Sequence, residues 1–539
     1  MSERSATVLA YHEATKHHFD RYARGPGRLD WASQPDPFRR YPGAPVIALE
    51  KVALAAEPAY DAAWTRGAII PAPLDRRTLS QFFLDTLALS AWKRSGAATW
   101  ALRVNPSSGN LHPIEGYAVC GPIDGVCSEP MVAHYAPEEH ALEQRVSIPL
   151  PLWQRITAGL PGETILVGLT CIHWRESWKY GERAYRYSQL DLGHVLGAIS
   201  VAAAGLGWQA SLVDSLSSRE VAQILGVLDA AGAEPEEAAC LVLVTPQGSK
   251  IRDVLPDSDA VAAMTELTWQ GRPSRLSRSH QVWPIIDEVA EACRKPSGVS
   301  PCPPATLPAG PAPGEVRAVA LRSIIHQRRS AQDLDGTTPM PRSDFYRMLL
   351  RTVARADGIP FSTLPWTPGV HLAVFVHRIQ ELMSGLYLLV REPGHEERLR
   401  QAMNPAFTWE KPEGCPEGLD LYLLMPGDLR KLAMQLACVQ ALAADGCFSL
   451  AMIADFEEVL ERYDPWMYPR LYWECGMIGQ VLYLEAEAAG LRGCGIGCYF
   501  DDPMHELLGL KDQRFQDLYH FTVGKALEDP RINTLPAYP

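Results

Sequence analysis

Apolar and polar residues alternate in the same order in two parts of the chain. In each part, a β-type apolar run is followed by a long apolar helix, a glycine turn and another β-type run. The β-type runs lie at residues 164–170 and 239–245 in the first part, and at 448–453 and 519–523 in the second. The pattern predicts an α+β or α/β arrangement that occurs twice.

The two parts also match residue by residue. Residues 179–227 align without a gap to residues 462–510. Polar and small residues recur at equivalent places: Tyr180 and Tyr463, Asp191 and Glu474, Gly193 and Gly476, Gly207 and Gly490. A match of this length predicts a duplication. The small residues of the helix expected at 472–490 allow a second helix to approach closely. Ordinary core packing is favoured for most of these positions, and the pattern is also consistent with the interface of a pseudo-dimer.

A proline-rich stretch divides the chain between the two copies. Seven prolines fall between Lys295 and Glu315, where a packed element cannot form, so residues 291–316 are predicted to be a linker. We expect a first domain at 66–290 and a second at 317–539. The polar residues 1–65 are expected to form an N-terminal arm with a helix start near Tyr11, for which an exposed helix is favoured over a histidine metal site.

Composition excludes several classes of protein. The 539 residues are too many for one ordinary domain, and 47% hydrophobic with 21% charged residues is typical of a globular chain. A net charge of −13 argues against nucleic-acid binding. The longest apolar run, at 195–206, is too short to cross a membrane, and the polar N-terminus predicts no secretory signal. The twelve scattered cysteines indicate reduced thiols in the cytoplasm and no metal site.

Four short motifs carry candidate chemistry. The P-S-S-G-N turn at 106–110 offers hydroxyl, amide and backbone N–H groups, and R-R-S at 328–330 suits a phosphate or a polar ring edge. The glycine-rich 490–498 follows a helix and leads into a strand, which is the wrong context for a dinucleotide fingerprint. Its glycines favour close approach to a flat ligand. The fourth motif, V-G-K-A-L-E-D-P-R at 523–531, ends a strand with basic residues.

As a set, these motifs resemble the FMN-dependent nitroreductase superfamily, and within it the branch that oxidises thiazolines and oxazolines in modified peptides. The likeness covers most of residues 70–250 and 320–535. It also rests on P-I-E after the P-S-S-G-N-L-H turn, K-Y-G-E-R-A-Y-R-Y at 179–187 and E-x-x-x-x-x-Q-x-L-Y-L-x-A-E-A-x-G-L. The resemblance implies an α+β fold, with two tandem nitroreductase-like domains, each an antiparallel-rich mixed sheet flanked by helices, forming an intramolecular pseudo-dimer.

The resemblance also implies a flavin site shared between the two copies. Family members are typically homodimers with FMN at the interface, and here each half carries motifs that the other lacks. The implied FMN-binding residues of the second half are Arg328, Ser330, Gln332, Gly495, Ile496, Gly497, Lys525 and Arg531. Those of the first half are Pro106, Ser107, Ser108 and Asn110. The resemblance therefore implies one intact site and one decayed site per chain.

The implied catalytic residues are Lys179 and Tyr180, since a Lys-Tyr pair at this place in the azoline-oxidising branch is implicated in removing a substrate proton. A lysine base needs a depressed pKa, whereas the equivalent Arg462 cannot serve as a base. Interface packing is the other interpretation of this segment. Function stays open among dehydrogenation of azoline-type peptides, NAD(P)H-dependent reduction of nitro compounds or quinones, and an inactive flavin-binding or partner-docking protein. The expected partners are a small-molecule or modified-peptide substrate, without nucleic acid or membrane.

Overall fold

The computed structural model describes all residues except 1, 229–231, 250–256, 303–316, 356–357 and 539. The first half contains a seven-stranded sheet whose strands lie in this order: β1 (Val46–Ala48), β6 (Ala141–Ser147), β5 (Met131–Ala136), β4 (Ile114–Cys120), β7 (Ile165–Cys171), β9 (Glu237–Pro246) and β8 (Trp208–Leu212). The second half contains a six-stranded sheet in the order β12 (Leu421–Pro426), β11 (Gly385–Leu389), β10 (Val370–Val376), β13 (Phe448–Asp455), β15 (Phe515–Gly524) and β14 (Arg492–Ile496).

The two sheets have the same topology once the short β1 is set aside. Neighbouring strands pair antiparallel in both, and β7 and β13 each carry a register shift just before their ends. The central strands are buried on both faces, which explains why they read as continuous apolar runs rather than alternating ones. The expected α+β duplication is confirmed.

Helices fill the space between and around the sheets. Those of the first half and the connection are α1 (Glu3–Ala14), α2 (Arg76–Thr86), α3 (Leu150–Ile156), α4 (His173–Tyr180), α5 (Ala184–Gly205), α6 (Ser218–Leu225), α7 (Ser258–Ala263) and α8 (Pro284–Ala292). Those of the second half are α9 (Leu321–Gln327), α10 (Arg342–Thr352), α11 (Glu396–Ala402), α12 (Arg430–Leu436), α13 (Leu442–Asp445), α14 (Phe456–Tyr463), α15 (Tyr468–Ala488) and α16 (Asp501–Leu508). No helix in the described part of the chain has the length and apolar character to span a membrane.

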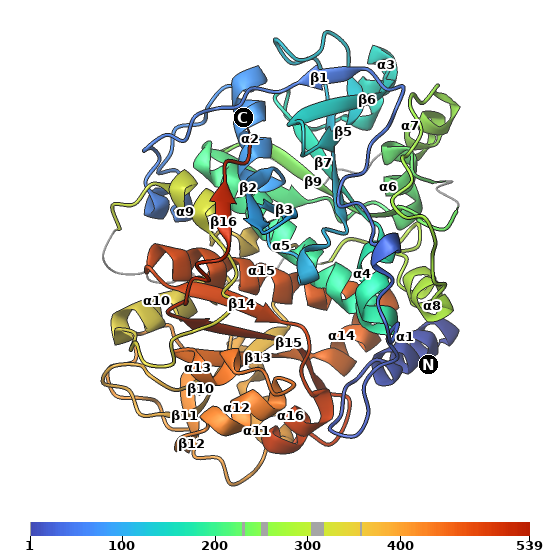
Figure 1. Ribbon diagram of the computed structural model, residues 1–539. Helices are drawn as coiled ribbons and strands as arrows, with labels where there is room; N and C mark the ends of the chain where they lie inside the picture. Colours follow the sequence, from blue (N-terminus) through green and yellow to red (C-terminus); the bar gives the residue numbers. More distant parts are fainter. Residues whose placement is uncertain (1, 229–231, 250–256, 303–316, 356–357, 539) are drawn as a thin grey trace.

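The long helices α5 and α15 join the two halves, as Figure 1 shows at the centre of the molecule. Both are buried along nearly their whole length. At their crossing, a Cβ on Gly193 would lie 2.2 Å from the carbonyl oxygen of Trp473, and one on Gly476 would lie 2.1 Å from that of Leu190. Only glycine allows the two backbones to touch at both equivalent positions.

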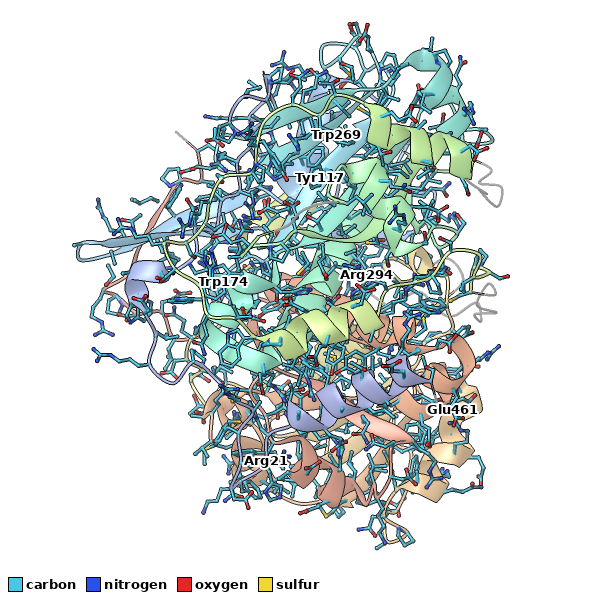
Figure 2. The ribbon with its side chains drawn as sticks, turned by 90° about the vertical axis from the view of Figure 1, so that its right-hand side faces the viewer. Arg21, Tyr117, Trp174, Trp269, Arg294 and Glu461 are labelled. Carbon is cyan, nitrogen blue, oxygen red and sulfur yellow. The ribbon has the colours of Figure 1, made fainter. Side chains whose placement is uncertain are left out.

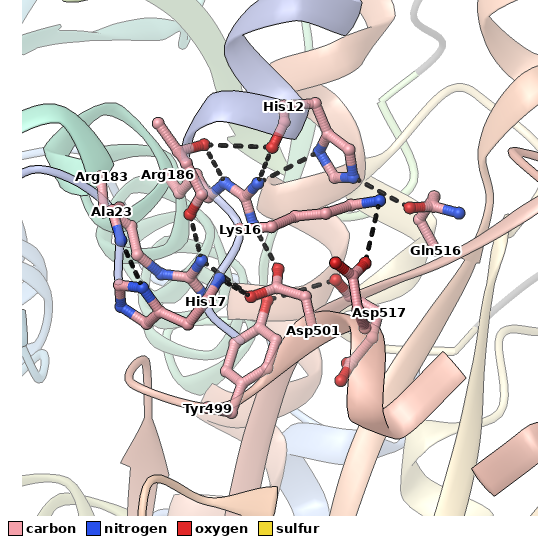
Figure 3. A network of polar contacts seen from close by, with 12 residues as sticks. His12, Lys16, His17, Ala23, Arg183, Arg186, Tyr499, Asp501, Gln516 and Asp517 are labelled. Atoms are coloured by element: carbon pink, nitrogen blue, oxygen red, sulfur yellow. Dashed lines mark hydrogen bonds and ion pairs between the residues drawn. The ribbon is translucent and has the colours of Figure 1, made fainter. Parts of the chain in front are cut away.

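Each terminus crosses to the opposite half. The C-terminal β16 (Asn533–Leu535) pairs with β2 (Leu89–Ser95), which in turn pairs with β3 (Ala98–Arg103). The N-terminal α1 packs against α8 and contacts Arg186 of α5, and Figure 3 shows Asp501 between Arg183 and Arg186 beneath it. Although burial disfavours a charged carboxyl, these guanidinium groups hold the pKa of Asp501 well below its usual range. The junction therefore contains charges that are paired across the two halves.

The N-terminal arm differs from the expected exposed helix. The helix starts at Glu3, where Ser2 caps it, and ends before Thr15. His12 is fully buried, because its ring lies against Phe456 and its Nε2 is 3.1 Å from Gln516 Oε1. A sequence pattern cannot reveal this burial, since the residues that cover His12 come from the other end of the chain.

Part of the predicted linker at 291–316 lies outside the described residues, namely 303–316. Its earlier residues pack onto the first half. The Lys295 ammonium lies 3.0 Å from Asp214 Oδ1, and the backbone N–H of Cys302 donates to Asp214 Oδ2 at 2.6 Å.

The helix crossing makes a stability prediction. Gly476→Ala forces a methyl group against the Leu190 carbonyl, so the two halves must move apart. We expect a loss of about 3 kcal/mol or more in unfolding free energy, although alanine normally favours a helix over glycine by ~0.5–1 kcal/mol. Chemical denaturation measures the change. Gly162→Ala is the control, because its Cβ would meet open space. Equal midpoints for the two variants would contradict the crossing.

Candidate functional site

A cavity of about 250 Å³ lies between the two halves. From the first half it is lined by β3 and the following turn, including Arg103, Asn105, Pro106, Ser107 and Asn110. From the second half it is lined by the segment after α9, by Arg492 at the start of β14, and by the C-terminal stretch 526–532, including Arg328, Arg329, Ser330, Gln332, Asp529 and Ile532. Folding thus brings together two predicted motifs that are more than two hundred residues apart.

Arg328 fixes the second half to the first at this cavity. Its side chain is buried, and Nε donates to the Val104 carbonyl at 3.0 Å while Nη2 donates to the Arg103 carbonyl at 3.1 Å. The guanidinium also lies 5.1 Å from the centre of the Tyr483 ring. Arg328 therefore holds the strand before the turn, in addition to any ligand contact.

The turn at 106–110 is held by its own polar side chains. Ser107 Oγ accepts the N–H of His112 at 2.8 Å, and Asn110 Nδ2 donates to the Ala101 carbonyl at 2.8 Å. Ser108 binds Asp191 on α5 through both its N–H and its hydroxyl. These side chains shape the turn, while Pro106, Ser107 and Asn110 still line the cavity.

The cavity is strongly cationic. Burial and the neighbouring Arg328 lower the pKa of Arg329 to about 10, and burial likewise lowers the pKa of Arg103 to about 10. The buried Arg103 Nε and Asn105 Oδ1 have no hydrogen-bond partner among the described residues. The Arg103 guanidinium itself donates to the Pro37 and Ile114 carbonyls in the first half. The positive charge available to an anion in the cavity therefore comes from Arg328, Arg329 and Arg492, and an anion would relieve the crowding of these charges.

This donor set fits the phosphate end of a flavin mononucleotide. The volume is below the ~300–1,000 Å³ of a typical ligand pocket, so the cavity matches the polar part of FMN rather than the whole molecule. Ser330 adds a hydroxyl at the exposed rim, 2.8 Å from the Tyr483 hydroxyl, and Gln332 is exposed beside it.

The glycine-rich strand β14 has a packing role that the sequence does not reveal. Gly493, Gly495 and Gly497 lie on one face, and a Cβ at each would collide with the chain's own rings, namely Phe521, Tyr519 and Tyr187. Ile496 points the other way and is buried in the core of the second half. A ligand can therefore meet only the main chain of Ile496.

Two basic residues expected at the phosphate lie outside the cavity lining. Lys525 is exposed, and its ammonium is 3.3 Å from the Gly490 carbonyl. Arg531 is 84% exposed and pairs with Asp529, which does line the cavity. The structure therefore brings six of the predicted binding residues into the lining, whereas Ser108, the β14 residues, Lys525 and Arg531 surround it.

Lys179 and Tyr180 lie in the last turn of α4, on the other side of the 106–110 turn. A Cβ on Gly109 would be 2.7 Å from the Tyr180 hydroxyl and 3.0 Å from Lys179 Nζ. The Tyr180 ring is 4.4 Å from the Tyr187 ring, whose hydroxyl donates to the Gly497 carbonyl at 3.0 Å. The Lys-Tyr pair is thus connected to both the turn and β14.

Two buried carboxyl groups beside this pair were not singled out in the sequence as chemical groups. Burial raises the pKa of Asp191 to about 7. Burial and the charge of Asp191 raise the pKa of Glu176 well above its usual value, and both its carboxyl oxygens are buried without a hydrogen-bond partner among the described residues. The sequence repeat draws attention to Asp191, because it aligns with Glu474. No sequence pattern indicates that Glu176 is buried beside it.

The equivalent carboxyl in the second half has a different environment. Glu474 accepts backbone N–H groups from Gly369 and Val370, as Asp191 does from Ser108. However, Glu474 is paired with Arg391. The backbone contact is therefore common to both copies, whereas the unpaired acid is specific to the first.

A smaller cavity of about 100 Å³ occupies the equivalent place on the other side of the molecule. Ser200 and Gln209 are among its lining residues. In the larger cavity, the residue equivalent to Gln209 is Arg492, which lines it, and the residue equivalent to Ser200 is Tyr483, which lies beside it. Beside the larger cavity, Tyr187 contacts Gly497. The equivalent residues beside the smaller cavity are Arg470 and Asp214, which form an ion pair. The lining of the smaller cavity contains one cationic residue, Arg66, whereas that of the larger one contains Lys93, Arg103, Arg328, Arg329 and Arg492. The two cavities therefore differ in size and in charge.

Comparison with known proteins agrees with this architecture. The model of the family described as "Nitroreductase family" matches residues 72–244 and 374–525. A protein of Methanocaldococcus jannaschii assigned as a nitroreductase is 28% identical over 126 residues, which cover 23% of this chain and 63% of the relative. The family model covers more than half of the chain in two copies, and the chain belongs to the nitroreductase family.

One solved structure shares the fold over nearly the whole chain. A crystal structure from Anabaena variabilis, also assigned as a nitroreductase, covers 97% of this chain and 99% of its own, with a TM-score of 0.69 and 21% identity. A chain of the E. coli microcin synthetase complex covers 45% of this chain and 92% of its own, at 15% identity and a TM-score of 0.26.

The acid beside the turn makes a pH prediction. Because the folded pKa of Asp191 is raised, its protonated form contributes stability below about pH 4, and this contribution is lost as the pH rises through about 7. Asp191→Asn keeps an acceptor for Ser108 without a charge. We expect its unfolding free energy to rise relative to wild type between pH 4 and 8, on the order of 1–3 kcal/mol. A difference that does not change with pH would contradict the raised pKa.

Glu474→Gln is the matched control for this experiment. It leaves the buried Arg391 without its carboxylate, so we expect a loss of about 3–5 kcal/mol at neutral pH. Denaturation at each pH measures both variants. The two equivalent positions should therefore respond in opposite directions at pH 8.

Proposed function

We propose that the chain is an FMN-dependent oxidoreductase with one flavin site, built by both of its halves. The observation that carries this proposal is the cationic cavity, where the 106–110 turn of the first half meets the 328–332 segment of the second. Membership of the nitroreductase family supports it. Arg328, Arg329 and Arg492 would face the phosphate, while Ser330 and Gln332 would meet polar edges at the rim.

Bound FMN would supply acceptance or donation of a hydride, and the chain's own residues would bind and orient it. The small second cavity supports a single site. Gln209 takes the place of Arg492 there and Ser200 that of Tyr483, so a phosphate finds less room and less positive charge.

We further propose that the substrate is an azoline-type ring in a modified peptide or a related small molecule that loses a proton and a hydride. Lys179 and Tyr180 would act on the proton, because they flank the turn at Gly109. Asp191 and Glu176 would take part in proton exchange beside them, since a carboxyl with a pKa near 7 can gain and lose a proton at neutral pH.

The phosphate contact can be tested with two flavins that differ only in that group. Arg492→Gln gives the first cavity the residue found at the equivalent place in the second. We expect the affinity for FMN to fall about 10–100-fold, since a charge-assisted hydrogen bond is worth ~1.5–3 kcal/mol. Riboflavin, which has no phosphate, should bind wild type and variant equally. Fluorescence quenching of the flavin measures both affinities.

The control for this prediction is Gln209→Arg, which alters the smaller cavity alone. It should leave the affinity of the first site for both flavins unchanged. An Arg492→Gln variant that binds FMN and riboflavin with equal losses, or with no loss, would show that the phosphate does not lie there.

The proton-removal role is tested at Lys179. Lys179→Ala should lower the rate of flavin reduction by a heterocyclised peptide at least ~100-fold, because general base catalysis typically contributes 10²–10⁴-fold. FMN affinity should not change. Arg462→Ala, at the equivalent place in the second copy, should leave the rate unaltered. Stopped-flow absorbance of the flavin gives the rate, and an unchanged rate for Lys179→Ala would remove this residue from the mechanism.

A further inference from the structure

A cavity of about 870 Å³ is separate from the proposed flavin site. It lies where α1, α6 and α8 approach the interface between the two halves, and it shares no lining residue with the 250 Å³ cavity. Figure 2 shows this side of the molecule, with α1 and α8 crossing it and Arg294 at the end of α8. Its volume falls within the ~300–1,000 Å³ of typical ligand pockets.

Three side chains in this cavity form a hydrogen-bonded series. Cys171 Sγ lies 3.3 Å from His173 Nδ1, and His173 Nε2 lies 3.3 Å from Glu237 Oε2. All three residues line the cavity, and the side-chain exposure rises from the buried thiol to 10% for His173 and 28% for Glu237. A nucleophile in contact with a base, which a third group orients, is the arrangement of covalent catalysis through a thiol.

The Cys171 thiol lies beside two positive groups, the N-terminus of α4 and the ring of His173. Cys171 is the last residue of β7, directly before the N-terminus of α4, where the helix dipole stabilises negative charge. Burial lowers the pKa of His173, but the neighbouring Cys171 and Glu237 outweigh it and raise that pKa to about 10. His173 is therefore a cation at neutral pH, next to the sulfur.

The second half shows that the fold does not require these groups. Strand registers define the equivalent positions: Cys171 pairs with Ile114 and Glu237, whereas Ala454 pairs with Val370 and Gln516. The residue two places after Ala454 is Phe456, at the place of His173. The same junction is thus built with an alanine, a phenylalanine and a glutamine.

The equivalent space in the second half is filled. His12 of α1 packs on the Phe456 ring at 4.5 Å and contacts Gln516, so the N-terminal helix occupies that side. The side that carries Cys171, His173 and Glu237 keeps an open cavity. The thiol, the base and the space for a ligand therefore occur together on one side of the molecule.

We propose that Cys171, His173 and Glu237 form a nucleophilic thiol site that takes an acyl group from an activated ester or thioester. With the proton on His173, the Cys171 sulfur forms a bond to the acyl carbon. The bond from that carbon to the leaving oxygen or sulfur breaks, and His173 returns the proton to the leaving group. Water or an amine then accepts the acyl group, and the thiol is restored.

Alkylation of the purified full-length chain by iodoacetamide tests the nucleophile. Cys293 is the internal reference, because it lines the same cavity but burial raises its pKa to about 12. Mass spectrometry should find Cys171 modified at least about tenfold faster than Cys293 at pH 7. His173→Gln, which keeps the thiol, should reduce the rate at Cys171 to that of Cys293. Equal rates at the two cysteines in the wild type would overturn the proposal.

A small activated ester, p-nitrophenyl acetate, tests the acyl step. We expect a rapid release of one nitrophenolate per chain, with the acetyl group on Cys171. The burst should disappear in Cys171→Ala and persist in Cys293→Ala, with both variants retaining the wild-type unfolding midpoint. A burst that survives in Cys171→Ala, or an acetyl group found elsewhere, would refute acyl transfer at this site. Because the assay uses no flavin, its result is independent of the proposed flavin site.

Discussion

The backbone contact between α5 and α15 at Gly193 and Gly476 is the constraint on which the rest of the structure depends. These glycines let the two long helices touch, so the halves lie close enough for Arg328 to reach the carbonyls of Arg103 and Val104. The cavity between the 106–110 turn and the 328–332 segment exists only at this separation. The exchanged termini stabilise the same arrangement, with α1 on the second half and β16 on the first.

The duplicated scaffold has been kept while its polar groups have diverged. In both copies, a carboxylate of the long helix accepts a backbone N–H from the segment that precedes β4 or β10. Among the described residues, an arginine partner is found for Glu474 but not for Asp191. The order of the strands and their registers are the same in both copies. However, β7 ends at Cys171, whereas the equivalent strand β13 continues past Ala454. The chemistry therefore lies in the differences between the copies, because the features required for folding are common to both.

Much of the fold could be predicted from the sequence. Buried strands and long helices produce apolar runs, and a gapless repeat identifies the duplication. The structure places P-S-S-G-N and R-R-S at one cavity, and their role in flavin binding stays a prediction. Three features depend on contacts between distant segments of the chain. They are the burial of His12, the close packing of Tyr187 and Tyr519 against the glycines at 495 and 497, and the buried Glu176 oxygens that lack a hydrogen-bond partner among the described residues. No local pattern records such contacts.

The central claim is that two copies of one domain build one flavin site. Titration of the flavin-free chain with FMN, followed by fluorescence quenching or calorimetry, measures this directly. The account predicts one FMN per chain, bound in the cavity that contains Arg328 and Arg492. Two equivalents per chain would contradict it, as would the absence of specific binding.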